Sequence, residues 1–258
     1  MIEELLLLSE KVGKKILTFY KQEFEVQQKE NNTPITIADK EAHKLLSEGL
    51  QKITPKLPIL SEEGELVDFE IRKNWQQYWL IDPLDGTRDF INKTGDFVVS
   101  IALIKNNKPI LGVIYSPVLK THYFATKNKG AFKKINNITQ KIQTNENIQQ
   151  EFKVVVGRYS NKSKKLNNFL DERLVKYNFF EVGSALKFCL IAEGKYDFYP
   201  KLGPCSEWDS AAGICILEEA GGLVIDENNQ PLRYNIKEDT KSPIFFAGSR
   251  QFFKQSKF

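Results

Sequence analysis

The sequence predicts a mixed α/β protein in two halves, and three observations lead to that fold class. The apolar residues between positions 5 and 19 recur with helical spacing, which indicates an amphipathic core helix. Short apolar runs bounded by polar turns alternate with further helical segments. A polar stretch rich in Asn and Gln, residues 135–150, divides the chain into an expected N-terminal domain, 1–140, and a C-terminal domain, 150–258.

The first half combines two helices with several strands. After the helix near the N-terminus, Thr36-Ile37-Ala38-Asp39 reads as a helix start, in which Thr36 caps and Asp39 completes a capping box. An apolar strand at residues 56–61 then ends in Glu62-Glu63-Gly64. The remaining strands of this half are expected at residues 79–81, 97–104, 110–115 and 123–125, the middle two forming a hairpin.

The second half alternates between strands and helices. Strands are expected at residues 154–157 and 223–225. The helices are expected at residues 160–171, at 184–193 and from Trp208-Asp209 to Gly221-Gly222.

Composition limits the class of protein. The 258 residues are enough to bury a sizeable core. The 37 Lys plus Arg nearly balance 33 Asp plus Glu, giving a formal net charge of +4, which is typical of a globular surface. This mildly basic balance leaves nucleic acid open as a partner without arguing for it. Three Cys with no CxxC pair fit a reducing compartment, and only two His argue against a His-rich zinc site.

The sharpest local signal is Asp82-Pro83-Leu84-Asp85-Gly86-Thr87, which follows an apolar strand. Two carboxylates ~4 Å apart repel by about 4 kcal/mol at an effective dielectric constant near ~20, so one is protonated or a cation lies between them. Oxygen ligands without His or Cys favour Mg²⁺, Ca²⁺ or Mn²⁺ over zinc. The Leu84 carbonyl is a further oxygen, Gly86 allows close approach of an anion, and Thr87 adds a hydroxyl. The dipeptides alone also fit a solvent-exposed turn, but the six residues together favour a metal site.

Four other acids have ordinary structural explanations when taken alone. Glu62 and Glu63 fit a solvated surface, Asp209 fits a helix N-cap, and Asp39 fits the capping box. A capping Asp can still present its second oxygen to a metal, and helix N-termini favour phosphate.

The spacing of four segments resembles the inositol monophosphatase superfamily of metal-dependent, lithium-sensitive phosphatases. These segments are residues 36–39, 61–63, 82–87 and 208–222, and the last two match the signature patterns of the superfamily. Residues 82–91, 108–115 and 183–189 look most like the bacterial 3'(2'),5'-bisphosphate nucleotidases of the CysQ type, in which the position of Arg88 is often Lys.

The resemblance implies a layered αβαβα sugar-phosphatase fold with an N-terminal α+β part and a C-terminal α/β part. It also implies two to three Mg²⁺ ions in a site between the parts. One ion would be held by Glu62, Asp82 and the Leu84 carbonyl, and a second by Asp82, Asp85 and Asp209.

The resemblance also implies catalytic roles for Glu62, Asp39 and Thr87. A third, weaker Mg²⁺ near Glu62 would hold the attacking water, and Asp39 with Thr87 would polarise it. The chain has no Cys or His nucleophile motif, which agrees with direct attack by water. Glu63 matches the second acid of the family, and its role stays open.

Substrate contacts are implied in both halves. Gly183-Ser184-Ala185-Leu186-Lys187 alone fits a helix start with a solvated Lys, but its counterpart in the nucleotidases lies beside the substrate. Lys187 would there meet the second phosphate of adenosine 3',5'-bisphosphate (PAP). Tyr199, Lys201 and Arg158 are further candidates. The full implied set of substrate contacts is Glu62, Leu84, Asp85, Gly86, Thr87, Gly183, Ser184, Lys187 and Asp209.

The expected function is therefore Mg²⁺-dependent hydrolysis of PAP to AMP and phosphate, linked to sulfate assimilation. An inositol monophosphatase-like enzyme is the alternative, and fructose 1,6-bisphosphatase activity is a weaker one. A non-catalytic RNA-binding role is disfavoured, because the sequence shows neither a recognition helix nor an aromatic platform for RNA bases. The expected partner is a small nucleotide bisphosphate and not a nucleic acid polymer.

The expected location is the cytoplasm. The leucine run at residues 5–8 is too short to span a bilayer and follows two Glu instead of basic residues, so we expect neither a signal peptide nor stable membrane insertion. The family resemblance leaves peripheral association with the inner face of the cell membrane open. The sequence does not indicate an oligomeric state.

Overall fold

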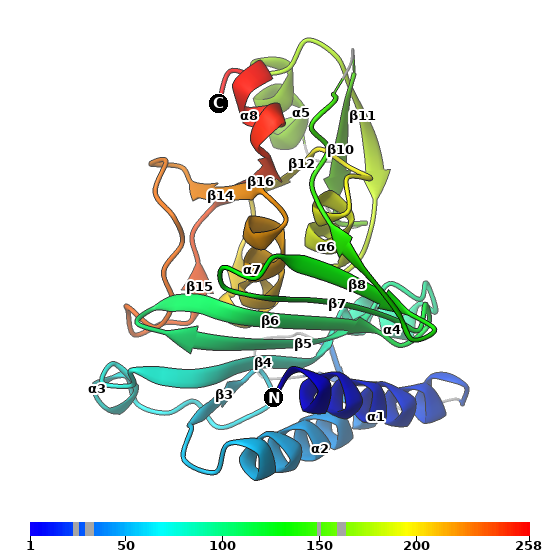
Figure 1. The fold of residues 1–258 in the computed structure, drawn as a ribbon, viewed down its shortest axis with the longest axis vertical. Coiled ribbons are helices and arrows are strands. Elements are labelled where there is room, and N and C mark those ends of the chain that lie inside the picture. The colour runs from blue at the N-terminus through cyan, green and yellow to red at the C-terminus, as the bar shows by residue number, and fades with distance from the viewer. Residues whose placement is uncertain (23–25, 29–33, 149–150, 159–163) are drawn as a thin grey trace.

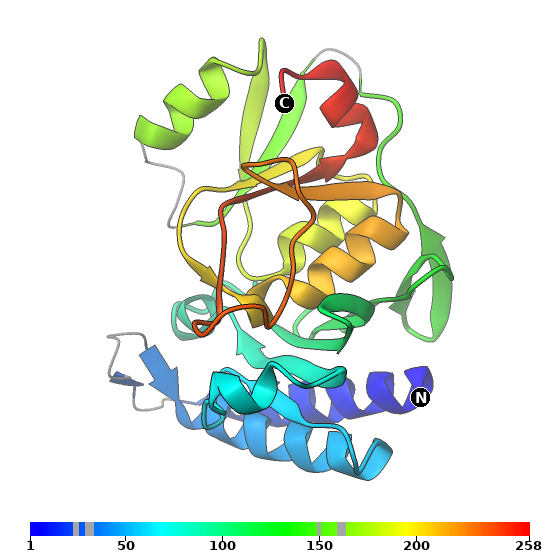
Figure 2. The same cartoon turned by 90° about the vertical axis from the view of Figure 1, so that its left-hand side faces the viewer.

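The computed structural model describes residues 1–22, 26–28, 34–148, 151–158 and 164–258. Its elements stack in five layers, helix–sheet–helix–sheet–helix, as the family resemblance implies (Figure 1). The first layer contains α1 (Ile2–Tyr20) and α2 (Ile37–Ile53), which pack on one face of a seven-stranded sheet. The N-terminal and C-terminal ends of the chain lie at opposite ends of this stack (Figures 1 and 2).

The seven-stranded sheet forms most of the first half, in the order β3-β4-β5-β6-β7-β8-β9. The pairs are antiparallel except β3 with β4, which are parallel. The strands are β3 (Ile59–Ser61), β4 (Gln77–Asp85), β5 (Val98–Lys105), β6 (Lys108–Ser116), β7 (Thr121–Thr126), β8 (Ala131–Ile135) and β9 (Ile138–Ile142). The small elements beside it are β1 (Val26–Gln28), β2 (Pro34–Thr36), α3 (Phe69–Arg72) and α4 (Thr87–Ile91).

The second half is built on a five-stranded sheet in the order β11-β10-β12-β16-β14. Its strands are β10 (Phe152–Val156), β11 (Tyr177–Glu181), β12 (Phe198–Lys201), β14 (Gly222–Asp226) and β16 (Phe245–Ser249). Its helices are α5 (Lys164–Asp171), α6 (Leu186–Ala192), α7 (Ala211–Glu219) and α8 (Arg250–Gln255). Three short elements complete it, namely β13 (Cys205–Ser206), the 3₁₀ turn η1 (Glu207–Asp209) and β15 (Lys241–Ser242).

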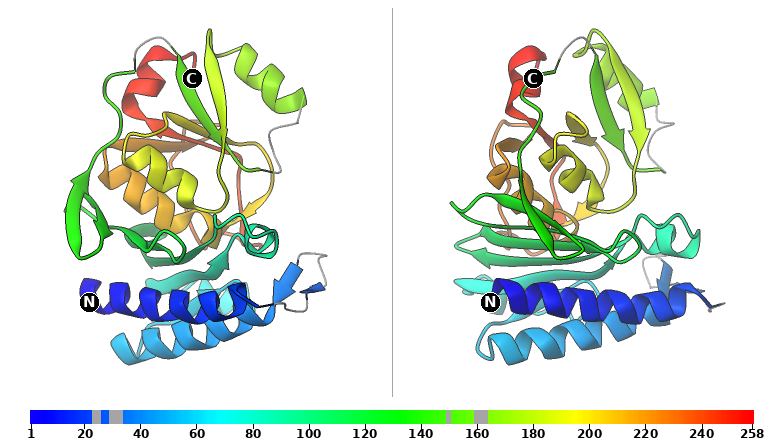
Figure 3. Two further views of the ribbon diagram at one scale, coloured as in Figure 1. Left: turned by 90° about the vertical axis from the view of Figure 1, so that its right-hand side faces the viewer. Right: turned by 45° about the vertical axis from the view of Figure 1, so that its right-hand side comes forward.

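Helices α6 and α7 run side by side between the two sheets (Figure 3). They belong to the largest buried apolar cluster, which joins residues of both halves. Gly112 of β6 lies against α7 so closely that a Cβ there would be 2.5 Å from the carbonyl oxygen of Ala212. A larger residue at position 112 would therefore push α7 away from the first sheet.

Most of the expected elements are present, with shifted boundaries. The capped helix after Thr36 and the hairpin of β5 and β6 are confirmed. The polar stretch 135–150 was expected to form a border, but β9 within it extends the first sheet to Ile142. The expected helix 160–171 is described from Lys164 onward, because residues 159–163 lie outside the described residues, as do 149–150. The division into two domains stays a prediction.

Among the described residues, no helix is both long enough and apolar enough to cross a membrane.

Candidate functional site

A cavity of about 340 Å³ lies where the two halves meet, at the end of β4. Residues from both halves line it. The lining includes ten of the residues expected from the sequence: Glu62, Asp82, Leu84, Asp85, Gly86, Thr87, Gly183, Ser184, Lys187 and Asp209. Asp39 and Glu63 are not part of this lining.

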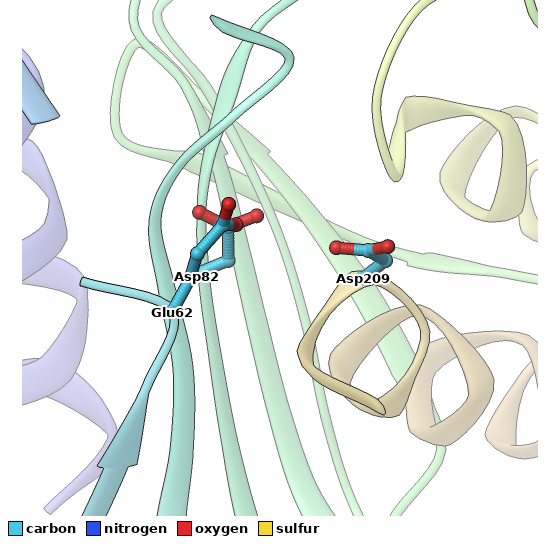
Figure 4. Close-up of side chains that lie close together, drawn as sticks. All are labelled: Glu62, Asp82 and Asp209. Carbon is cyan, nitrogen blue, oxygen red and sulfur yellow. The ribbon is translucent and has the colours of Figure 1, made fainter. Parts of the chain in front are cut away.

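Three carboxylates converge in the cavity. Glu62 follows β3, Asp82 lies on β4, and Asp209 ends η1 of the second half (Figure 4). One oxygen from each lies within 4.8 Å of the others. Burial, and then the neighbouring carboxylates, raise the pKa of Asp82 well above its ordinary value. Buried oxygen donors that repel one another are the kind of set that a hard divalent cation stabilises, so the residues fit a metal ion.

The chain from Asp82 to Asp85 is shaped by an irregularity in the sheet. The expected strand ended at residue 81, but β4 continues to Asp85, and its register with β5 shifts between Asp82 and Asp85. The Leu84 amide donates to Asp82 Oδ1 at 3.1 Å. Such a bulge redirects successive residues, which places both acids at the cavity instead of on alternate faces.

Gly86 turns the chain away from this strand. Its φ is +98°, in the left-handed region, and a Cβ there would lie 3.1 Å from the Asp96 carbonyl oxygen and 3.2 Å from Ser184 Cβ. Glycine is favoured by both constraints. The absence of a side chain at Gly86 therefore allows Ser184 of the second half to pack against this turn.

Asp39 makes hydrogen bonds in two directions. Its Oδ2 accepts from the amide and the hydroxyl of Thr36 at 2.7 and 2.6 Å, which confirms the capping box. Its Oδ1 accepts from Thr87 Oγ1 at 3.0 Å. Asp39 thus caps α2 and also holds the Thr87 hydroxyl, which lies 3.5 Å from the Leu84 carbonyl oxygen.

Asp209 is not the helix N-cap that the sequence indicated. It is the third residue of η1, where it forms a capping box with Ser206 and accepts from the Ser206 amide at 2.8 Å. Helix α7 begins only after Ser210. Burial and the charge of Glu62 raise the pKa of Asp209 to about 6.

Asp85 faces the second half. Its Oδ2 accepts from the Ala185 amide at 2.5 Å. Burial, and then the charge of Asp209, raise the pKa of Asp85 to about 7. Asp85 thus bridges the acidic segment and the loop that precedes α6.

Lys187 is buried, so the solvated Lys considered from the sequence is wrong. Its side chain is 6% exposed, and its ammonium donates to the carbonyl oxygens of Val182, at 3.3 Å, and Ser184. Burial lowers the pKa of Lys187 to about 8, against the opposing effect of Asp85. A buried basic group thus lines the same cavity as the carboxylates and interacts electrostatically with Asp85.

Arg158, expected as a phosphate contact, pairs with two acids at the rim of the cavity. Its guanidinium contacts Asp96, and its Nε lies 3.3 Å from Asp89 Oδ1. Asp96 also accepts from the Gly183 amide at 3.0 Å. The sequence did not indicate this cluster, because the acids and Arg158 are far apart in the chain.

An aromatic group forms another part of the lining. The rings of Phe188 and Phe245 lie with centroids 5.8 Å apart, and Tyr199 is 5.4 and 5.7 Å from them. Tyr199 and Lys201 were candidates from the sequence and both line the cavity. The two Phe were missed, since an apolar aromatic residue in a strand or helix is usually part of the core.

Comparison with known proteins agrees with this geometry. The model of the inositol monophosphatase family matches residues 1–244. A "3'(2'),5'-bisphosphate nucleotidase CysQ" from Salmonella typhimurium is 40% identical over 247 residues, covering 95% of this chain and 98% of that protein. Its namesake from Haemophilus influenzae is 40% identical over 255 residues, covering 98% and 94%. The crystal structure of CysQ from Bacteroides thetaiotaomicron aligns with a TM-score of 0.81 at 35% identity over 94% of each chain. The chain belongs to the inositol monophosphatase family.

Proposed function

We propose that the protein is a Mg²⁺-dependent 3'(2'),5'-bisphosphate nucleotidase that hydrolyses PAP to AMP and phosphate in sulfate assimilation. The observation that carries the proposal is one cavity that joins three converging carboxylates to a buried Lys and an aromatic group. The named relatives, at about 40% identity over nearly the whole chain, support the same activity.

The acidic side of the cavity is the proposed metal site. Glu62, Asp82 and the Leu84 carbonyl would hold one Mg²⁺, and Asp82, Asp85 and Asp209 a second, with up to three ions in all. Bound Mg²⁺ supplies positive charge for the transition state and lowers the pKa of water. Asp85 lies outside the closest trio, so its share in the site rests on the family resemblance and on its place in the lining.

Asp39 and Thr87 are the proposed proton-handling pair. Thr87 donates its hydroxyl proton to Asp39, which leaves an oxygen lone pair of Thr87 available toward the cavity. The attacking water gives its proton to Thr87 while Thr87 gives its own to Asp39. Glu62, which lines the cavity, would orient this water.

The second half holds the rest of the substrate in this proposal. Lys187 would meet the second phosphate, because it lines the cavity. Its ammonium has three N–H donors, and the carbonyl oxygens of Val182 and Ser184 accept from two of them, so the third is proposed to bind the phosphate. The adenine ring would pack on the aromatic group of Phe188, Tyr199 and Phe245. Gly86, Gly183 and Ser184 would complete the substrate contacts from the rim.

The deciding experiment is an assay of purified protein with PAP and with inositol 1-phosphate at equal concentration, each with Mg²⁺ and with EDTA. We expect Mg²⁺-dependent phosphate release with a clear preference for PAP, and inhibition by millimolar lithium. A preference for inositol 1-phosphate would favour the inositol monophosphatase-like alternative. Equal activity in EDTA would contradict the proposed metal site.

A further inference from the structure

Residues 234–242, which we call the clasp, contact both halves of the molecule. They lie between β14 and β16 in sequence and include β15. The chain that contains them descends from the second sheet to the first (Figure 2, orange to red). The clasp contacts the first half on one side and η1, which carries Asp209, on the other.

The attachment to the first half depends on Arg72, the last residue of α3. Arg72 is fully buried and donates to Asn235 Oδ1 and to two carbonyl groups further along the clasp. The Asn235 side-chain amide donates in return to the Arg72 carbonyl oxygen. A second link comes from Asn107, in the turn between β5 and β6, which donates to the Tyr234 carbonyl oxygen at 2.7 Å.

The attachment to η1 depends on Glu207. This side chain is 2% exposed, and its two carboxylate oxygens accept from the Asn235 amide at 2.9 and 3.0 Å. The Glu207 amide donates to the Thr240 carbonyl oxygen at 2.8 Å. Next to it, Ser206 pairs with Lys241 as β13 and β15. The start of the turn that leads to Asp209 is thereby tied to the clasp by two successive residues.

These contacts have a consequence for the trio of carboxylates. Glu62 and Asp82 belong to the first half, whereas Asp209 belongs to the second, so their approach within 4.8 Å depends on how the halves meet. Helix α7 holds the chain after Asp209, and the clasp holds the chain before it. Asn235 is the shared point, because it contacts both Arg72 and Glu207.

We propose that Glu207 is a positioning residue for the metal site. Through Asn235 and Arg72 it holds η1 against the first half, so that Asp209 completes the trio with Glu62 and Asp82. The inference rests on the proposed function in one respect only, namely that the trio binds a divalent cation. Groups that orient metal ligands typically change metal affinity by about 10–100-fold when they are removed.

The test measures binding of Mn²⁺ alone, by the loss of the free-ion electron paramagnetic resonance signal, without substrate. Glu207→Gln keeps the side-chain shape and one acceptor oxygen but turns an NH₂ group toward the clasp. We expect about tenfold weaker Mn²⁺ binding, the lower end of the range for such residues. The circular dichroism spectrum should not change.

Glu219→Gln is the matched control. Glu219 ends the helix that begins after Asp209, and it likewise accepts backbone amides, from residues 128–130 at 2.8 to 3.1 Å. We expect this variant to lower the melting temperature and to leave Mn²⁺ affinity unchanged. Asn107→Gly is a milder second variant, because its φ of 61° suits glycine, and we expect weaker Mn²⁺ binding in the same direction.

Two results would overturn the positioning role alone: unchanged Mn²⁺ affinity in folded Glu207→Gln, or an equal loss in Glu219→Gln. If Glu207→Gln does not fold, unchanged affinity in Asn107→Gly overturns it. Failure of the wild-type protein to bind Mn²⁺ would instead contradict the proposed metal site, and this inference with it.

Discussion

The two walls of the cavity differ in charge and in chemical character. The wall from the first half presents Glu62, Asp82 and Asp85, all carboxylates. The wall from the second half presents the Lys187 ammonium and the ring of Tyr199, although it also supplies Asp209. Burial raises the pKa of Asp82 and of Asp85 and lowers the pKa of Lys187, so each wall holds charged groups at a cost in desolvation.

The formal net charge of +4 is a sum over the whole chain, so it does not reveal that acidic and basic side chains are distributed unevenly between the two walls of the cavity. An acidic wall attracts cations, and a wall with a buried ammonium and aromatic rings suits a phosphate joined to a flat base. The proposed nucleotidase uses each wall for a different part of the reaction. Variants on the two walls should therefore fail in different ways.

The largest effect is expected from Asp82→Asn on the acidic wall. Turnover should fall by about a thousandfold or more, because the central carboxylate of the trio is lost. In EDTA the melting temperature should not fall, because Asn removes a buried acid that lies close to other acids.

Asp197→Asn is the control for this variant. Asp197 is equally buried but accepts from the Asn145 side chain and the Lys153 amide, so the Asp197→Asn variant should be less stable and keep wild-type turnover. If Asp82→Asn turned over substrate at the wild-type rate, the acidic wall would have no part in the reaction.

The next effect concerns the hydroxyl that links the acidic wall to α2. Thr87→Val removes the donor to Asp39 and should lower kcat by about a hundredfold at saturating substrate, within the range for proton-transfer groups. Thr87→Ser keeps the hydroxyl and should retain most of the activity. Equal losses in the two variants would show that Thr87 acts through packing and not through its hydroxyl.

On the opposite wall, Lys187→Met should raise the KM for PAP by about tenfold, the effect of one charged hydrogen bond, with a smaller change in kcat. Adenosine 3'-monophosphate lacks the 5'-phosphate and is the matched substrate. If Lys187 meets the second phosphate, the KM for the monophosphate should change much less. The same rise for both substrates would assign Lys187 to general packing of the cavity.

The smallest effect is on the stability of the metal-free protein as a function of pH. The folded-state pKa values of Asp85, about 7, and Asp209, about 6, lie above ordinary carboxyl values. Their protonation stabilises the fold at low pH, and this contribution is lost as pH rises through the folded-state values.

In EDTA, the Asp85→Asn variant should therefore gain stability relative to the wild type as pH rises from 5 to 8, by about 5 °C in melting temperature. His122, whose pKa burial lowers to about 4, acts with the opposite slope but equally in both proteins. The difference between the two melting curves thus isolates the carboxylate. Parallel curves would contradict the raised pKa of Asp85.

The sequence predicted the parts of the site that lie close together in the chain. Residues 82–87 carry two acids, a proline and a glycine in one turn, and the positive φ of Gly86 agrees with the expected turn chemistry. The capping box of Thr36 and Asp39 was likewise predicted from local spacing and is confirmed. The metal, catalytic and substrate roles of these residues stay predictions.

Other features could not be predicted from local spacing. A Lys near a helix start is usually solvated, and the packing of α6 between the two sheets is what buries Lys187. Glu207 was not singled out from the sequence, yet it is buried and accepts from the Asn235 backbone amide, 28 residues further along the chain. The bulge in β4 depends on its pairing with β5, so the expected strand ended too early.

By itself, the sequence predicted which residues would carry the chemistry, in the acidic turn and the capped helix, and its resemblance to a family implied the layered fold. Only the tertiary structure decided that Glu62, Asp82 and Asp209 meet within 4.8 Å and that a buried Lys187 lines the same cavity. The physical reason is the range of the forces involved. Turns and caps follow from hydrogen bonds within a few residues, whereas burial and the approach of like charges depend on how two sheets and the helices between them pack.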